Sequence, residues 1–145
     1  LNQNQQSINQ DGMDMALLYF DNDLRTVQYA GAFNPLYIIK KGVLTEYKAD
    51  LFSVGMNEVR ETSPFKNNNI VLEKGDALYI FTDGYTDQFG GPHDRKFLKK
   101  QFQELLLSIQ DKPMKDQERL LDNAYENWKG KADQVDDVMV IGLRV

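Results

Sequence analysis

One apolar run near the middle of the chain restricts the possible folds more than any other feature. Residues 77–81 are rich in aromatic and β-branched side chains, which favours a strand buried on both faces. The run begins after a Gly-Asp turn and stops at Thr82-Asp83-Gly84. A stiff strand would fix the Asp83 carboxylate for a metal ion, and Gly84 would let the backbone turn away. Asp-Gly is also a common turn signal, so this stretch alone favours an ordinary turn.

A second group of carboxylates precedes the last apolar run of the chain. Asp136 and Asp137 stand directly before residues 138–145. If this run and residues 77–81 are neighbouring antiparallel strands, Asp83 and Asp136 meet at one rim of a sheet. Carboxylate oxygens are the ligands that Mg²⁺ and Mn²⁺ prefer, so the pattern predicts a divalent-cation site. The alternative is an acidic pair that caps a strand and faces solvent.

The composition excludes several classes of function. The chain has 145 residues and a net charge of -5 without a run of basic residues, which argues against a nucleic-acid-binding surface. It has no cysteine, which rules out disulfides, thiolate zinc sites and a thiolate nucleophile, and which fits a cytoplasmic location. The sequence contains no signal peptide and no apolar stretch of about 18 residues, so we expect no membrane contact by these residues.

The first half of the chain predicts strands joined by short turns. Alternating apolar residues predict one hairpin over 14–20 and 24–30 and a second over 37–40 and 43–47. Shorter strand-like pieces are expected at 58–65 and 70–72. This order is typical of an antiparallel meander.

Two amphipathic helices are predicted in the second half, after a Gly/Pro-containing loop at 86–94 that we expect to be mobile and to contact a protein substrate. We expect Trp128 to pack the second helix against the sheet. Gly130 is expected to end that helix. The apolar stripe of the first helix is Phe97, Leu98, Phe102, Leu105, Leu106 and Ile109, and that of the second is Leu120, Leu121, Ala124, Tyr125 and Trp128.

Three sequence pieces occur in a fixed order along the chain. They are an Ala-Gly-x-x-x-Pro segment within 29–38, a Gly-Asp-x-Leu strand that runs into Thr-Asp-Gly at 75–84, and the Asp-Asp pair at 136–137. Gly55 and Asp87 also stand at matching places. Together these pieces resemble the bacterial SpoIIE/RsbU-like group of metal-dependent type 2C (PPM) Ser/Thr protein phosphatases, and the resemblance covers nearly the whole chain.

The resemblance implies an α+β fold, in which an antiparallel β-sandwich is flanked by helices in four α-β-β-α layers. It also implies that a metal-activated water hydrolyses phosphoserine or phosphothreonine, with two Mn²⁺ or Mg²⁺ ions in the complete domain. Asp83 and Asp136 are expected to ligate one ion. Asp137 belongs to the same metal site, and ligating or orienting roles stay open for Asp137, Asp87 and Thr82. No catalytic residue beyond the metal ligands and no further cofactor is implied.

One segment of the family pattern is missing. The Asp-x-Ser-Gly-His-Gly stretch, whose Asp bridges the two ions in the family, does not occur in residues 1–145. We therefore expect residues 1–145 to be the C-terminal part of a single phosphatase catalytic domain, incomplete at its N-terminus and inactive alone. The family's histidine belongs to the missing stretch, so His93, the only histidine here, receives no catalytic role.

The family acts on phosphorylated proteins in bacterial signalling, typically anti-sigma-factor antagonists, and an upstream sensor or regulatory domain is expected in the parent protein. The alternative is a phosphatase-like module that binds or regulates without catalysis. A haloacid-dehalogenase-type phosphotransferase is excluded, because it needs an aspartate two positions before Asp83, where this chain has Phe81.

Overall fold

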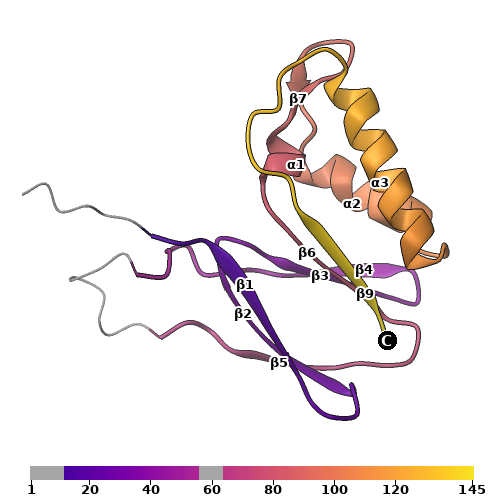
Figure 1. Ribbon diagram of the computed structural model, residues 1–145. Coiled ribbons are helices and arrows are strands. Elements are labelled where there is room, and N and C mark those ends of the chain that lie inside the picture. The colour runs from indigo at the N-terminus through magenta and orange to yellow at the C-terminus, as the bar shows by residue number, and fades with distance from the viewer. Residues whose placement is uncertain (1–11, 56–63) are drawn as a thin grey trace, which may run out of the picture.

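The structure is a computed structural model, and it describes residues 12–55 and 64–145. The elements in these ranges are short strands followed by two longer helices (Figure 1). In chain order they are β1 (Met15–Phe20), β2 (Thr26–Ala32), β3 (Leu36–Lys40), β4 (Val43–Tyr47), β5 (Asn68–Val71), β6 (Ala77–Phe81), α1 (Gly84–Asp87), β7 (Phe89–Gly90), β8 (Arg95–Lys96), α2 (Lys99–Ile109), α3 (Met114–Lys129) and β9 (Val140–Arg144).

The elements form three stacked layers. A three-stranded antiparallel sheet, β1-β2-β5, packs against a four-stranded antiparallel sheet, β4-β3-β6-β9, and α2 and α3 cover the other face of the four-stranded sheet (Figure 1). Strands β7 and β8 form a separate small hairpin. The predicted α+β fold with an antiparallel sandwich and flanking helices is confirmed, with helices on one outer face among the described residues.

Strand β6 lies in the middle of both cores. Its residue Leu78 joins the core between the two sheets, and Tyr79 and Phe81 join the core between the four-stranded sheet and the helices. This alternation explains why four of its five residues are buried, as predicted for a strand covered on both faces. Both cores bury large apolar and aromatic side chains, which is the main favourable contribution to folding.

Strands β6 and β9 are antiparallel neighbours, as predicted, with Phe81 opposite Val140 (Figure 1). The end of β6 and the entrance of β9 therefore share one rim of the sheet. The last strand differs from the prediction in two ways. It begins at Val140, so two residues separate it from Asp137, and it is an edge strand with Ile141 half exposed.

The two predicted hairpins are confirmed as β1–β2 and β3–β4. The predicted strand at 58–65 lies largely outside the described residues, and Pro64 and Phe65 are not in a strand. The predicted strand at 70–72 begins earlier, at Asn68, because Asn68 and Asn69 pair with β2. Pairing with a neighbouring strand thus outweighs the low strand preference of asparagine here.

The two predicted helices are confirmed, with two local corrections. Leu98 is not on the buried stripe of α2, because it precedes the helix with a φ of 71° and is 58% exposed. Trp128 packs on the β7–β8 hairpin rather than on the sheet: its ring lies 5.3 Å from that of Phe97, and its Nε1 donates to the Gln88 carbonyl at 3.1 Å. Gly130 ends α3, as predicted, with a φ of 58°.

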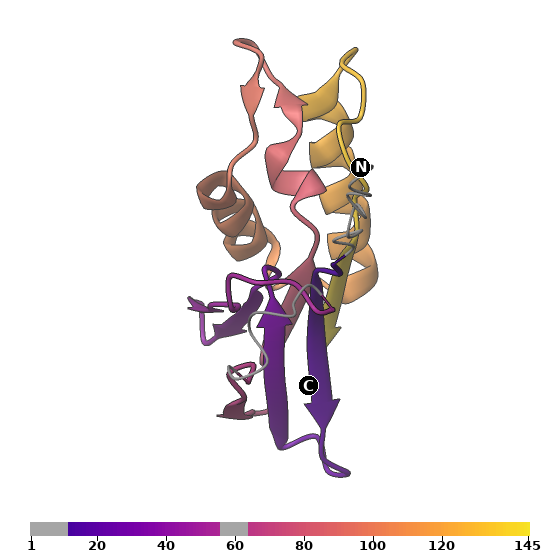
Figure 2. The same ribbon diagram turned by 90° about the vertical axis from the view of Figure 1, so that its left-hand side faces the viewer.

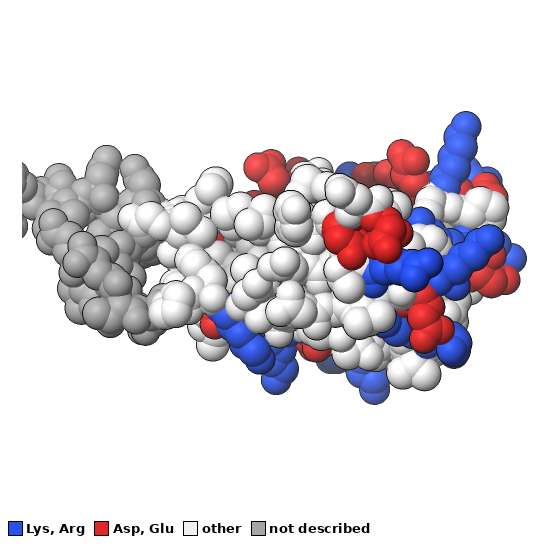
Figure 3. All heavy atoms as spheres, turned by 90° about the horizontal axis from the view of Figure 1, so that it is seen from below, with Lys and Arg blue, Asp and Glu red and all other residues white. Residues whose placement is uncertain are grey.

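No helix or strand of the described residues covers the outer face of the three-stranded sheet. Seen from that side, the protein shows a broad area without charged side chains (Figure 3). Exposed apolar residues on this sheet are Leu17, Tyr19 and Val71. No helix within residues 12–55 and 64–145 is both long and apolar enough to span a membrane.

Candidate functional site

Three segments that lie far apart in the sequence meet at the rim where β6 ends. They are the turn at 82–84, the loop that leads into β9, and the crossover at 33–35 that joins the two sheets. These are the same three pieces on which the family resemblance rests. The fold therefore brings the pieces together in space.

Thr82 connects the end of β6 to the loop before β9. Its side-chain Oγ1 donates to the Asp137 carbonyl at 2.8 Å and accepts from the Met139 N–H at 2.9 Å. Its backbone N–H donates to the Met139 carbonyl at 3.0 Å. One hydrogen bond to Asp137 and two to Met139 thus hold the loop before β9 beside the Asp83 turn.

Gly84 permits a close approach of the same loop. A Cβ atom at position 84 would lie 2.9 Å from the Asp137 carbonyl carbon and closer still to its oxygen, so a larger residue would clash with backbone. We predicted that Gly84 lets the chain turn away from the site. The structure gives a different reason, because Gly84 begins α1 and provides space for Asp137.

The three predicted metal-site carboxylates belong to exposed residues at this rim. Asp83 is the N-cap residue of α1, and its side chain makes no capping hydrogen bond. The Asp136 Oδ1 accepts from the Asp137 N–H at 2.7 Å, and the Asp136 carbonyl accepts from Gln134 Nε2 at 2.8 Å. The rim can therefore offer several carboxylate oxygens to a ligand that approaches from solvent.

A pocket of about 240 Å³ opens between the crossover and the Asp83 turn. Asp87 contributes a second carboxylate to it, and the Asp87 Oδ2 lies 2.7 Å from Lys96 Nζ. Lys96 therefore balances the charge of Asp87, and no cation among the described residues forms an ion pair with Asp83. The lining residues are Phe33, Asn34, Pro35, Phe81, Asp83, Asp87 and Lys99.

The residues at the rim suit a hard divalent cation in type but not in number. All candidate ligands are carboxylate oxygens, which Mg²⁺ and Mn²⁺ prefer, and Mg²⁺ commonly keeps several waters beside one or two carboxylates. Among the described residues, no three His, Cys, Asp or Glu side chains come together as a metal-binding group. These residues can therefore supply part of an oxygen-ligand site.

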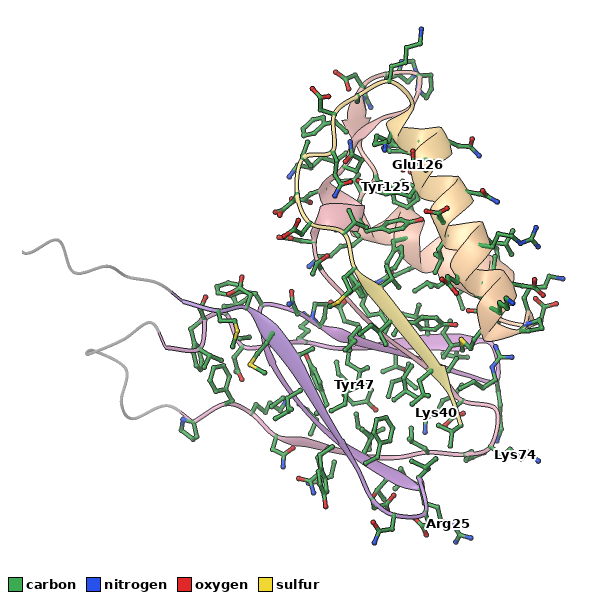
Figure 4. The ribbon with its side chains drawn as sticks, in the orientation of Figure 1. Arg25, Lys40, Tyr47, Lys74, Tyr125 and Glu126 are labelled. Atoms are coloured by element: carbon green, nitrogen blue, oxygen red, sulfur yellow. The ribbon has the colours of Figure 1, made fainter. Side chains whose placement is uncertain are left out.

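Sequence reasoning missed Gln88, which is completely buried behind the rim. Its Nε2 donates to the Asp133 carbonyl at 2.9 Å, and its Oε1 accepts from the Tyr125 hydroxyl at 2.7 Å and from the Val135 N–H at 3.3 Å. Tyr125 projects from α3 (Figure 4). Gln88 thus links α1, α3 and the loop that carries Asp136. In the sequence, only the short distance of four residues from Gly84 could have indicated that Gln88 lies near the site.

The segment at 86–94 is not the irregular loop that we predicted. It contains the end of α1, strand β7 and the turn that leads to β8, and α1 lies between α2 and α3 (Figure 2). The Tyr85 ring packs 4.7 Å from that of Phe102 and 5.2 Å from that of Tyr125, and the Gly91 N–H donates to the Trp128 carbonyl at 2.8 Å. His93 is exposed in the hairpin turn.

Two buried tyrosines near the rim act as neutral hydrogen-bond donors. Burial, with a smaller contribution from Asp50, raises the pKa of Tyr29 to about 12, and its hydroxyl donates to the Asn34 carbonyl at 2.8 Å. Burial also raises the pKa of Tyr85, whose hydroxyl donates to the Leu121 carbonyl at 2.7 Å. Tyr29 therefore anchors the crossover at neutral pH.

Solved structures of phosphatase domains share this fold. The SiaA-PP2C domain of Pseudomonas aeruginosa matches with a TM-score of 0.82 at 27% identity, over 92% of this chain and 52% of that chain. The PP2C phosphatase domain of SpoIIE from Bacillus subtilis, with a fragment of its regulatory domain, matches with a TM-score of 0.70 at 18% identity, over 91% of this chain and 37% of that chain.

A third match is the structure of the RsbU and RsbW domains of a Mycobacterium tuberculosis protein, with a TM-score of 0.64 at 21% identity, over 96% of this chain and 38% of that chain. The chain thus spans about half or less of these structures. A comparison with curated proteins gave no match. The sequence profile of Stage II sporulation protein E (SpoIIE) matches residues 1–145. The chain therefore belongs to the SpoIIE family, in the SpoIIE/RsbU-like group of PPM-type Ser/Thr phosphatases.

Proposed function

We propose that these residues form the C-terminal part of a catalytic domain that hydrolyses phosphoserine or phosphothreonine in a protein, using Mn²⁺ or Mg²⁺. One observation carries this proposal. The crossover, the Asp83 turn and the loop before β9 meet at one rim and bring the carboxylates of Asp83, Asp136 and Asp137 to it, and none of the three forms an ion pair within residues 12–55 and 64–145. That arrangement suits cation-assisted phosphoryl chemistry better than a purely structural turn.

The roles of the residues follow from their positions. Asp83 and Asp136 would hold a cation between them. Asp137 would ligate the cation or orient its other ligands and bound waters. When bound, divalent cations activate the attacking water and neutralise charge on the phosphoryl oxygens. The Thr82 hydroxyl fixes the Asp137 backbone, and Lys96 keeps Asp87 paired, so Asp87 would act by orienting other groups rather than by ligation.

The remaining ligands would come from residues outside 1–145. This chain spans 52% of the SiaA-PP2C domain, which supports the proposal that it is part of one domain and inactive alone. In the complete domain we expect two ions. The described residues supply only part of a ligand set, which agrees with the proposal that the other ligands lie outside residues 1–145.

The proposed substrate is a phosphorylated protein in bacterial signalling, such as an anti-sigma-factor antagonist. One structural neighbour contains RsbU and RsbW domains, and another includes a fragment of a regulatory domain, which supports a regulatory context and an upstream sensor or regulatory domain. A cytoplasmic location stays a prediction from the lack of cysteine.

A non-catalytic module is the second candidate, because no group of three potential metal ligands is present in the described residues.

Phosphate release from a phosphoserine peptide distinguishes the catalytic domain from the non-catalytic module. It should be measured with this chain and with the natural protein extended upstream of Leu1. We expect Mn²⁺-dependent release by the extended protein only, and loss of release in its Asp83→Ala variant. An extended protein that binds the peptide but releases no phosphate would favour the module.

A further inference from the structure

We propose that Lys99 binds the phosphoryl group of the substrate in the pocket between the 33–35 crossover and the Asp83 turn. This inference rests on the proposed function and names a substrate-binding residue for it. In sequence, Lys99 and Lys100 look like a pair on a solvated face. The structure separates them, because Lys99 lines the pocket together with Asp83 and Asp87.

The ion pairs around the pocket leave Lys99 available. Lys96 is engaged by the Asp87 carboxylate at 2.7 Å. In the part of the chain that the structure describes, neither the Lys99 ammonium nor the Asp83 carboxylate has an ion-pair or hydrogen-bond partner. The pocket thus contains one free anionic group and one free cationic group.

The charge balance favours a phosphate ester once a cation is present. The charges of Asp83, Asp87, Lys96 and Lys99 cancel. A divalent cation at Asp83 would leave two positive charges, which a phosphomonoester dianion neutralises. An ammonium group forms strong charge-assisted hydrogen bonds to phosphate oxygens. Lys99 can therefore hold a phosphoryl oxygen while Asp83 faces the cation.

The backbone fixes Lys99 relative to the Asp83 turn. Lys99 is the first residue of α2, and the residues before it are bonded to the segment that follows Asp83. The Leu98 N–H donates to the Thr86 carbonyl at 2.8 Å, and the N–H of the buried Phe97 donates to the Gln88 carbonyl at 3.0 Å. Backbone hydrogen bonds therefore connect the start of α2 to the segment that follows the Asp83 turn.

The pocket lining also includes the apolar residues Phe33, Pro35 and Phe81, which suit the carbon atoms of a substrate residue. Phe33 has a φ of 58°, and 44% of the residue is exposed. Such a backbone conformation is costly for a bulky residue, and its N–H is held by the Asp50 carbonyl at 2.9 Å. The fold thus keeps an exposed aromatic ring beside the charged groups.

Titration of this chain with inorganic phosphate, with and without saturating Mn²⁺, tests the proposal. Calorimetry would give the affinities, and amide NMR shifts of Asn34 and Lys99 would locate the phosphate. We expect Lys99→Met to weaken phosphate binding about 10-fold and to leave Mn²⁺ affinity unchanged. Lys100→Met, the matched control, should leave both affinities within about twofold, and Lys99→Arg should restore most of the phosphate affinity.

The outcomes separate this inference from the proposed function. Equal phosphate affinities in Lys99→Met and the natural chain, or equal losses in Lys99→Met and Lys100→Met, would overturn the role of Lys99 and leave the cation site standing. Absence of phosphate binding by the natural chain under both conditions would also overturn it. If Mn²⁺ does not bind but phosphate shifts the Lys99 amide and Lys99→Met removes that shift, the phosphate site stands and the cation site on this chain fails.

Discussion

Strands β6 and β9 lie side by side in one sheet, but they position their acidic residues by different means. Strand β6 is buried on both faces and ends two residues before Asp83, so core packing fixes the start of the turn. Strand β9 is an exposed edge strand, and Asp137 precedes it by three residues. The Asp136–Asp137 loop is held by Thr82, Gly84 and Gln88 instead.

This difference has a physical consequence. The position of Asp83 should be as stable as the core, because moving it requires unpacking β6. The position of Asp136 and Asp137 depends on a few hydrogen bonds and one close backbone contact. Variants that remove these contacts should therefore displace one half of the rim and leave the other in place.

The largest effect is expected for Gln88→Leu. This change leaves the Tyr125 hydroxyl, the Asp133 carbonyl and the Val135 N–H without their partner, and it should lower the free energy of unfolding by about 2 to 4 kcal/mol. Urea unfolding would measure the loss. Amide hydrogen exchange should increase at 133–137 much more than at Asp83.

Gln117→Leu is the matched control for Gln88→Leu. Gln117 is also buried, and it bonds the Tyr79 hydroxyl at 2.7 Å and the Lys112 carbonyl at 2.8 Å, away from the rim. We expect a similar loss of stability without faster exchange at 133–137. If both variants increase amide hydrogen exchange at 133–137 equally, Gln88 has no special role in holding this loop.

Gly84→Ala should have the next largest effect. The new methyl group would collide with the Asp137 backbone, which costs about 1 to 3 kcal/mol and pushes the loop away from the turn. A crystal structure of the variant would show the displacement. In the control Gly142→Ala, the nearest atoms are side-chain atoms at 3.3 Å, so a loss below about 1 kcal/mol is expected there.

Thr82→Val should cost about 1 to 2 kcal/mol, because it removes the hydroxyl that bonds Asp137 and Met139 and keeps the side-chain shape. Thr82→Ser keeps the hydroxyl and should remain within about 0.5 kcal/mol of the natural chain. Thermal unfolding of the two variants provides the measurement. Equal losses would show that the methyl group, rather than the hydroxyl, matters.

The smallest effect is expected for Tyr29→Phe, which touches neither strand. Loss of the hydrogen bond to Asn34 should cost about 1 kcal/mol at neutral pH. Because burial raises the pKa of Tyr29 from 10.0 to about 12, the neutral hydroxyl stabilises the fold fully below pH 10, and this contribution disappears as the pH rises toward 12. The stability difference between the two proteins should therefore shrink over that range, which urea unfolding at several pH values would show.

Much of the fold could be predicted because apolar patterns report burial directly. The alternation over residues 24–30 predicted the second strand of the first hairpin, and the apolar run at 77–81 gave the bounds of β6. The acidic residues at the ends of two apolar runs suggested that these runs pair, and β6 and β9 do pair. The backbones of the candidate site residues meet at one rim, and the metal-ligating roles of these residues stay predictions.

The features that sequence reasoning missed depend on tertiary contacts of polar residues. Gln88 looks like a loop residue in sequence, and only its partners on α3 and in the loop before β9 make it a buried link. Lys99 looks solvated until the fold places it beside Asp83. Trp128 has an apolar ring that fits a sheet as well as a hairpin, so its pattern could not indicate which of the two it contacts.

The most direct test of the cation site is paramagnetic broadening of the amide NMR signals of this chain by substoichiometric Mn²⁺. We predict that the amides at 82–84 and 136–137 broaden first and together, and that Asp83→Asn abolishes this broadening. Broadening that is strongest elsewhere, for example at the acidic face of α3 around Asp116 and Asp122, would contradict a shared cation site at the rim. Broadening at 82–84 and 136–137 that persists unchanged in Asp83→Asn would contradict it as well.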